Sequence, residues 1–566
     1  MEKKENTEGL LKAIRLFLAV MPFIIGGFHV WGSALASVFL VCCLFVIYRR
    51  NCHLFFAFDP VFTALLVLEA FLLISPFWAV DSGMAVFGFI KFLPLPLFCI
   101  LLMQCKVPSP ASYLAYIPYS GAVMMVVSFV LSRIPALTSF FTVFKRQAGF
   151  FQYSNTYALF LLTGACILLF KREKSIVELV VSVLLMVGVL LSGSRTVFIL
   201  MGALMLVYII WEKNKKIKIS LASALVLLVL AAGGYAYFTK NYDTVGRYLT
   251  SSLSSSTFIG RFLYYRDALP VILTHPFGLG YGGYKTLQGS FQTGVYSVVH
   301  IHNDYLQMLL DAGWVPFGFS VFALIKSLRK GNAVKYAASI LILVHVLFDF
   351  DLQFIAMGLI LMALLRDNEK EVKSYVFTKA PELYIALVIS ACLSLYFGVA
   401  SALGHMDKNE SAVKVYPGYT DCWVEILKKT EDPQQMEVVA DKILALNDSC
   451  SIANSAKARV LFSRGDVLTM EQYKLKAISL NKYSLEEYLD YIDMMRFAME
   501  LYLENGDLES ASYCASRIIS IPDMIDNVRQ GTSPLGWKIK DQPELDLPAE
   551  YTDYIDYLLS IYGIIS

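Results

Sequence analysis

The sequence predicts an all-α protein, a polytopic membrane helix bundle followed by a C-terminal α-helical repeat domain. Of the 566 residues 57% are apolar and only 17% are charged, whereas a soluble globular protein carries about 25% charged residues. Apolar runs long enough to cross a bilayer recur through residues 1–404. Residues 405–566 differ, because they hold 16 Lys and Arg against 27 Asp and Glu. We therefore predict a membrane domain over 1–404 and a soluble domain over 405–566.

The apolar runs predict 12–13 transmembrane helices, since a bilayer core about 30 Å thick needs roughly 20 apolar residues per helix. The runs lie at 11–29, 33–48, 60–77, 84–103, 113–131, 153–170, 176–191, 196–212, 217–238, 305–327, 334–350, 353–366 and 379–403.

The Lys and Arg content of the short loops orients these spans, because cytoplasmic loops are enriched in both residues. With the N-terminus in the cytoplasm, the inner connections carry Arg49, Arg50, Lys106, Lys171, Arg172, Lys174, Lys213, Lys215, Lys216, Lys218, Lys326, Arg329, Lys330, Lys335, Arg366, Lys370 and Lys373. The alternate connections are poor in Lys. We predict a multi-pass protein of the cell (inner, cytoplasmic) membrane with a large extracytoplasmic loop at 239–302 and an extracytoplasmic C-terminal domain.

The ten cysteines do not predict a disulfide framework. Most lie in or beside apolar segments, where a thiol behaves as a small hydrophobe. Three lie in the predicted soluble domain, and an odd number permits at most one bond there. Cys422 and Cys450 are a candidate pair, although pairing does not follow from sequence.

Unusual polar residues gather on the predicted outer side. They are Arg146, Arg195, Arg261, Arg266, His300, His302, His345, Asp349 and Asp351. Each one by itself has a structural alternative, since an outer arginine anchors in lipid headgroups and a histidine at a helix end is often a satisfied structural group. Ionisable residues at membrane depth are costly, however, and four separate segments bring Arg or His to one face. We therefore predict a functional site there.

The chemistry of this set suits an anionic substrate. Arginine presents a planar fork that binds phosphate oxygens in pairs and stays charged at any working pH. Histidine titrates near neutral pH, so it accepts a proton from a hydroxyl group. Both residue types fit a reaction that transfers a group from a lipid diphosphate to a hydroxyl acceptor. No DxD-like pair lies beside these residues, so neither a metal nor another cofactor is predicted.

Glu69 and Lys91 lie on neighbouring predicted spans, each about eight residues, or roughly 12 Å, from the outer end. We interpret them as a buried structural ion pair, in preference to a proton relay.

Several motifs in order resemble the O-antigen ligase and O-antigen polymerase superfamily. The elements are FQYSN at 151–155, SGSR at 192–195, GR at 260–261, HPFGLGYG at 275–282, HN at 302–303 followed by Gly313, and HVLFDF at 345–350. The resemblance covers roughly residues 60–366, with the signature at about 146–366. Pro316 departs from the small or hydroxylated residues usual at that place in ligases.

The resemblance implies a metal-independent glycosyltransferase of the polysaccharide polymerase or ligase type, acting in cell-envelope glycan biosynthesis with a polyprenyl-diphosphate-linked donor. It implies that Arg195 and Arg261 hold the diphosphate and that His302 activates the acceptor hydroxyl or orients the donor. Asn303 would support His302. Substrate-binding residues of second rank are Arg146, Arg266, His345 and Asp349.

Two other functions stay open at this point, namely an exporter or flippase of lipid-linked glycans and a non-catalytic scaffold. The acceptor is also open, as a glycan, a lipid or a protein hydroxyl. A protein partner of the C-terminal repeats fits the sequence, and a nucleic acid does not.

A short motif recurs in the C-terminal domain. Leu446 and Leu480 are equivalent positions of this motif, 34 residues apart. A third copy of the motif, at 517–522, follows after about 41 residues. A 34-residue period is that of tetratricopeptide arrays. We predict a degenerate array of this kind, the alternative being a helical cap on the outer loop.

Overall fold

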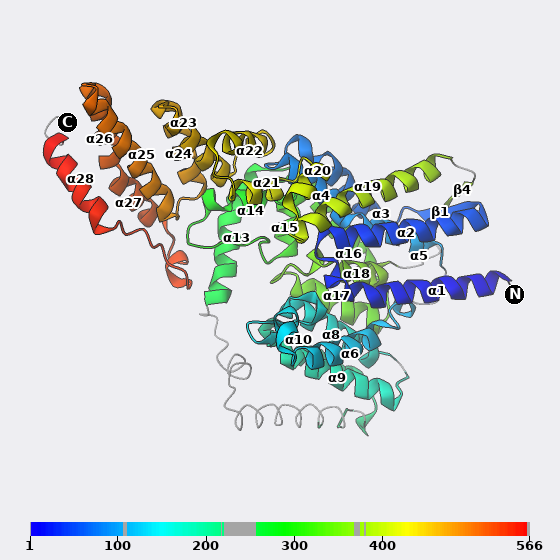
Figure 1. Cartoon of the computed structure of the whole chain (residues 1–566). Helices are drawn as coiled ribbons and strands as arrows, with labels where there is room; N and C mark the ends of the chain where they lie inside the picture. Colours follow the sequence, from blue (N-terminus) through cyan, green and yellow to red (C-terminus); the bar gives the residue numbers. More distant parts are fainter. Residues whose placement is uncertain are drawn as a thin grey trace.

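The computed structural model describes residues 2–105, 110–171, 173–216, 256–366, 374–378 and 381–562, together with residues 218, 219 and 223. This part of the chain is almost entirely helical (Figure 1). Strands form only two short antiparallel pairs within it, β1 (His53–Ala57) with β4 (Ser374–Thr378) and β2 (Thr142–Val143) with β3 (Arg146–Gln147). The prediction of an all-α helical membrane protein is confirmed.

Most helices of residues 1–405 coincide with the predicted apolar runs, whereas Pro135–Phe141, Ser256–Thr274 and Gly283–Phe291 lie between those runs. The helices are α1 (Glu2–Val20), α2 (Val30–Asn51), α3 (Pro60–Ile74), α4 (Ser82–Phe92), α5 (Pro94–Met103), α6 (Ile117–Leu131), α7 (Pro135–Phe141), α8 (Ser154–Leu169), α9 (Ile176–Ser192), α10 (Arg195–Trp211), α13 (Ser256–Thr274), α14 (Gly283–Phe291), α15 (Asp304–Ala312), α16 (Trp314–Ser327), α17 (Ala333–His345), α18 (Ile355–Leu365) and α19 (Pro381–His405).

Four helical segments of the described chain are long and apolar enough to cross a membrane, namely Val30–Asn51, Pro60–Phe77, Ser82–Met103 and Pro381–His405, and seven shorter apolar helices accompany them. The predicted span 217–238 lies outside the described residues, apart from residues 218, 219 and 223. The run 305–327 is not one helix, because it breaks at Gly313 into α15 and α16. A Cβ at Gly313, whose φ is +83°, would lie 2.3 Å from the carbonyl oxygen of Pro276, so the turn needs glycine.

The predicted ion pair between Glu69 and Lys91 is wrong. Lys91 Nζ instead donates to the carbonyl oxygens of Gly27, at 3.1 Å, and Phe28. Glu69 is buried, and neither of its carboxylate oxygens has a hydrogen-bond partner in the described part of the chain. The reason is local: the turns after α1 include the short helix Ile25–Gly27 with positive φ at Gly26 and Gly27, and they leave carbonyl groups that accept from the buried ammonium.

Two central helices bring the polar segments together. Helices α8 and α18 are buried along almost their whole length, as expected for helices that are apolar on all sides. The polar residues 153–156 begin α8, and residues 349–353, including the turn Asp351–Gln353, precede α18. Side-chain bonds from Asn155 to Asp349 and from Thr156 to Asp351 join these two ends.

The C-terminal helices extend away from the bundle, with the two chain ends on opposite sides of the molecule (Figure 1). They are α20 (Asn409–Val415), α21 (Thr420–Leu427), α22 (Pro433–Leu446), α23 (Ser451–Ser463), α24 (Val467–Leu480), α25 (Leu485–Glu504), α26 (Leu508–Ile519), α27 (Ile521–Gly531) and α28 (Ala549–Tyr562). The recurring motif falls at the ends of α22, α24 and α26. Its assignment to a tetratricopeptide array stays a prediction.

The candidate disulfide between Cys422 and Cys450 is not formed. Both residues carry free thiols, as do the other eight cysteines. Cys422, on α21, is buried among Ala412, Val413 and Tyr419, so it serves as a small packing residue there.

Asp81 joins the C-terminal helices to the bundle. Its side chain caps α4 by accepting from Met84 N at 2.8 Å, and it also accepts from Thr420 Oγ1 at 2.9 Å and Asn447 Nδ2 at 3.0 Å. Gly289 makes a second close contact, since a Cβ there would lie 2.1 Å from the carbonyl oxygen of Leu480. The C-terminal helices are therefore packed directly on the bundle end and on α14.

We expect Asp81→Ala to destabilise this attachment by about 1–3 kcal/mol, because it leaves buried hydrogen-bond donors without an acceptor. Limited proteolysis of the detergent-solubilised protein should then release the C-terminal helices faster. The matched control is Asp421→Ala, which removes an exposed ion pair with Lys285 and should change little. Equal proteolysis rates for the two variants would contradict the assignment.

Candidate active site

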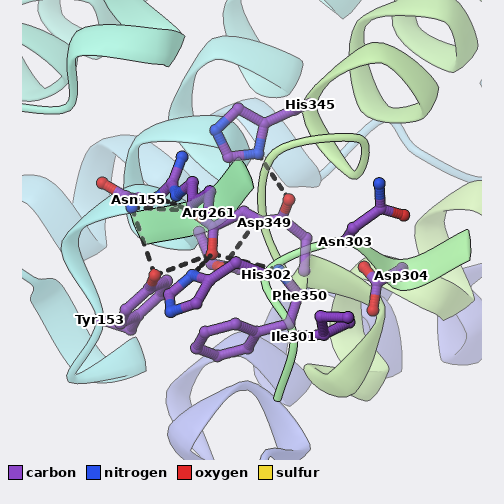
Figure 2. A network of polar contacts seen from close by, with 12 residues as sticks. Tyr153, Asn155, Arg261, Ile301, His302, Asn303, Asp304, His345, Asp349 and Phe350 are labelled. Carbon is purple, nitrogen blue, oxygen red and sulfur yellow. Dashed lines mark hydrogen bonds and ion pairs between the residues drawn. The ribbon is translucent and has the colours of Figure 1, made fainter. Parts of the chain in front are cut away.

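A buried carboxylate, Asp349, lies at the centre of the polar residues (Figure 2). Its Oδ1 accepts a hydrogen bond from Tyr153 OH at 2.7 Å, and its Oδ2 accepts one from Asn155 Nδ2 at 2.7 Å. Arg261 Nη2 lies 3.3 Å from Oδ2, and His302 Nδ1 lies 3.3 Å from Oδ1. The side chain of Asp349 is 1% exposed. Four groups from three distant segments thus converge on one carboxylate.

The charge of Asp349 is maintained by its neighbours. Burial opposes its ionisation, but Arg261 and His302 outweigh this effect, so that the pKa of the carboxyl lies below its usual range. The carboxylate therefore stays ionised at neutral pH and balances the buried guanidinium of Arg261.

His302 sits in an unusual backbone conformation, with φ at +57°. A side chain rarely occupies this left-handed region, and such residues cluster at functional sites. The conformation is supported by Tyr265, whose hydroxyl donates to the carbonyl oxygen of His302 at 2.6 Å. The ring packs against Phe350, with centroids 4.9 Å apart. With Nδ1 directed at Asp349, Nε2 is the ring nitrogen that points away from this carboxylate.

Asn303 fixes the position of the His302 segment without bonding to the His302 ring. Its Oδ1 caps α15 by accepting from Tyr305 N and Leu306 N, each at 3.0 Å, and its Nδ2 donates to the carbonyl oxygen of Leu347 at 3.0 Å. An asparagine at this position satisfies the free N–H groups of a helix start.

Arg146 and Arg195 come from two further segments. Arg146 Nη2 donates to Asn155 Oδ1 at 2.7 Å, and Arg146 Nε donates to the carbonyl oxygen of Ser192 at 2.8 Å. Arg146 therefore connects the Asp349 network to the turn that carries Arg195, the first residue of α10. Arg195 is half-buried there.

His345 forms a separate pair with a second carboxylate. Its Nδ1 bonds to Asp351 Oδ2, and the other oxygen of Asp351 accepts from Thr156 Oγ1 at 2.7 Å. Both members of the pair are fully buried. The structure thus places His345 behind the site as a structural partner, while Asp349, two residues before Asp351, faces His302.

Arg266 does not join the network. It lies five residues after Arg261 on α13, which turns it about 140° away around the helix, and its side chain is exposed. Its assignment as a substrate-binding residue receives no support from this geometry.

Sequence reasoning missed several residues of the site. Tyr153 and Asn155 bond directly to Asp349, Tyr265 bonds to the His302 backbone, and Phe350 packs on the His302 ring. The only signal for the first two was the resemblance of residues 151–155 to a family element, since neutral polar residues at a helix start are common.

His300 is a histidine of the same segment with a different environment. Its ring packs on Phe28 and Phe350, with centroids 5.9 and 5.2 Å away. Burial, and after it the nearby Lys91, lower the pKa of His300 to about 3. His300 is therefore neutral and packs as an aromatic ring.

Arginine, histidine and aromatic side chains surround one carboxylate at the site. Within the described part of the chain, no three His, Cys, Asp or Glu side chains are grouped so that they could hold a metal ion.

Residues 180–323 match the family model described as O-antigen ligase. The match covers about a quarter of the 566 residues and includes Arg195, Arg261, His302 and Gly313. It confirms the resemblance to the O-antigen ligase and polymerase superfamily and supports a role in glycan biosynthesis at a membrane. Arg146 and Asn155 precede the match, and Asp349 follows it. No curated protein matches the chain.

We expect Asp349→Ala to lower the apparent Tm strongly, because it leaves the buried charge of Arg261 without its partner. Breaking one side of such a pair costs about 3–5 kcal/mol. Thermal unfolding in detergent would measure the shift. The control is Asp546→Ala, which removes a carboxylate that is 95% exposed and should leave the Tm nearly unchanged. Similar shifts in the two variants would contradict a central role for Asp349.

Proposed function

We propose that this O-antigen ligase-like protein is a membrane glycosyltransferase that transfers a glycan from a polyprenyl-diphosphate carrier to a hydroxyl acceptor at the predicted outer face. The observation that carries the proposal is the His302–Asp349–Arg261 arrangement, in which one buried carboxylate orients a histidine and an arginine together. The family match and the apolar helices support the membrane setting.

His302 is suited to act as a general base. Its Nδ1–H donates a hydrogen bond to the Asp349 carboxylate, which selects the tautomer with a free lone pair on Nε2. A positioned histidine of this kind accepts the proton of a hydroxyl group as that group attacks. The ring is 21% exposed, so the acceptor can reach it.

Arg261 is suited to hold the donor diphosphate. Its Nη2 contacts Asp349, while its Nε is buried and has no hydrogen-bond partner among the described residues. A buried guanidinium N–H without an acceptor favours an anionic ligand at that place. Arg146 and Arg195 add positive charge from the neighbouring segments.

The reaction follows from these roles as a single displacement. His302 Nε2 takes the proton of the acceptor hydroxyl, and the hydroxyl oxygen forms a bond to the anomeric carbon of the donor glycan. The bond from that carbon to the diphosphate oxygen breaks, and its electron pair leaves on the diphosphate. The arginines stabilise the negative charge that develops there, and the configuration at the anomeric carbon inverts.

We expect His302→Ala and Arg261→Ala each to lower glycan transfer by about 10²-fold or more, because removing a general base or a charge-stabilising donor has effects of that size. Purified protein in liposomes with a lipid-diphosphate glycan would show this by mass spectrometry of the products. Arg266→Ala is the matched control and should keep near-normal transfer. Full product from the His302 variant would overturn the proposal.

The same liposomes separate catalysis from transport. A transferase converts donor and acceptor supplied on one face, whereas an exporter or flippase moves unmodified substrate across the bilayer. We expect new glycosidic product without net translocation. Translocation of unmodified donor, with no product, would favour the exporter.

A further inference from the structure

An apolar cavity lies inside the membrane region, between α3, α15, α16 and α18. Its volume is about 120 Å³. Val61 and Leu72, at the two ends of α3, both line it, so it extends for about 16 Å along that helix. The cavity is therefore long and narrow. A space of this length and lining suits a hydrocarbon chain.

The cavity is also lined by two buried polar atoms for which the described part of the chain supplies no hydrogen-bond partner. Asp304 is the residue after Asn303, and its Oδ2 accepts from Leu352 N at 2.8 Å, but its Oδ1 has no hydrogen-bond partner among the described residues. Gln353 Oε1 is also without a partner there. The two side chains are only 5% and 3% exposed. Buried polar atoms of this kind are costly unless a hydrogen-bond partner reaches them.

The lining of the cavity does not suit a diphosphate, because the described residues that form it include no Lys, Arg or His. Its acidic side chains are Asp304 and Asp311. Figure 2 shows Asp304 on one side of His302, with Arg261 and Asn155 on the other. Diphosphate binding therefore belongs to the arginine side, and the cavity favours a neutral group that forms hydrogen bonds.

We propose that this cavity binds the hydrocarbon chain of a neutral, hydroxyl-bearing lipid, whose hydroxyl donates to Gln353 Oε1 or forms a hydrogen bond with Asp304 Oδ1. The cavity lining does not include His302, Asp349 or Arg261, so binding of this lipid alcohol does not depend on the proposed function.

Photolabelling with two probes of identical chain tests the proposal. Diazirine-bearing geranylgeraniol and geranylgeranyl diphosphate differ only in the polar end, and each is added to the full-length protein in nanodiscs. We expect the alcohol to label α3, α16 and α18, and the diphosphate to leave these helices largely unlabelled. Labelled peptides are identified by mass spectrometry.

Filling the cavity should remove the labelling. Ala64→Phe and Ala323→Phe place a ring inside it, and we expect each to lower alcohol labelling of these helices about tenfold, a loss of about 1.4 kcal/mol in affinity. The matched control is Ala203→Phe, an exposed position on α10, which should label as the wild type does. Gln353→Met should weaken labelling by the alcohol while circular dichroism stays unchanged.

Two results would overturn the inference. One is labelling of the cavity helices by the diphosphate and not by the alcohol, and the other is alcohol labelling that the two cavity variants do not reduce.

Failure of the lipid site is distinguishable from failure of the proposed function. A wild-type protein that transfers no glycan but binds the alcohol in the cavity refutes the transferase alone. A wild type that transfers glycan, with cavity labelling absent, refutes the lipid site alone.

Discussion

The buried carboxylate of Asp349 is the interaction on which the site depends. A carboxylate at 1% exposure is costly unless charges and hydrogen bonds compensate for its lost hydration. Arg261, His302, Tyr153 and Asn155 provide that compensation. The same contacts set the tautomer of His302 and the direction of Arg261. Under the proposed function, stability and catalysis are therefore coupled at this residue.

The bundle is arranged so that these contacts are possible. The buried helices α8 and α18 carry their polar segments at the same end of the bundle, joined by the bonds from Asn155 and Thr156. On the other side of His302, the α15 segment borders the apolar cavity. The result is a histidine between a cationic region and an apolar one.

Much of this organisation was predictable from the sequence, for definite physical reasons. Hydrophobic runs identify membrane helices because the bilayer has a known thickness. Arg146, Arg261, His302 and Asp349 were identified because charged residues are rare and costly at membrane depth. The same reasoning does not find Tyr153 or Asn155, which are neutral. It also predicted an ion pair between Glu69 and Lys91 from their similar depth in the membrane. In the structure, backbone carbonyl groups of a turn accept hydrogen bonds from the lysine instead.

The sequence by itself determined the class of the protein, because composition and hydropathy decide which segments enter a membrane. It also distinguished residues 405–566 by their composition and identified the small set of arginines and histidines from which the candidate site is built. Only the tertiary structure decided which of these side chains meet. Arg261 contacts Asp349 and Arg266 does not, because residues five positions apart on α13 point to different sides of the helix. His345 pairs with Asp351 and not with Asp349, because packing around α8 separates two carboxylates that lie two residues apart. Contacts between residues about 200 positions apart depend on helix rotation and packing, which local sequence patterns do not record.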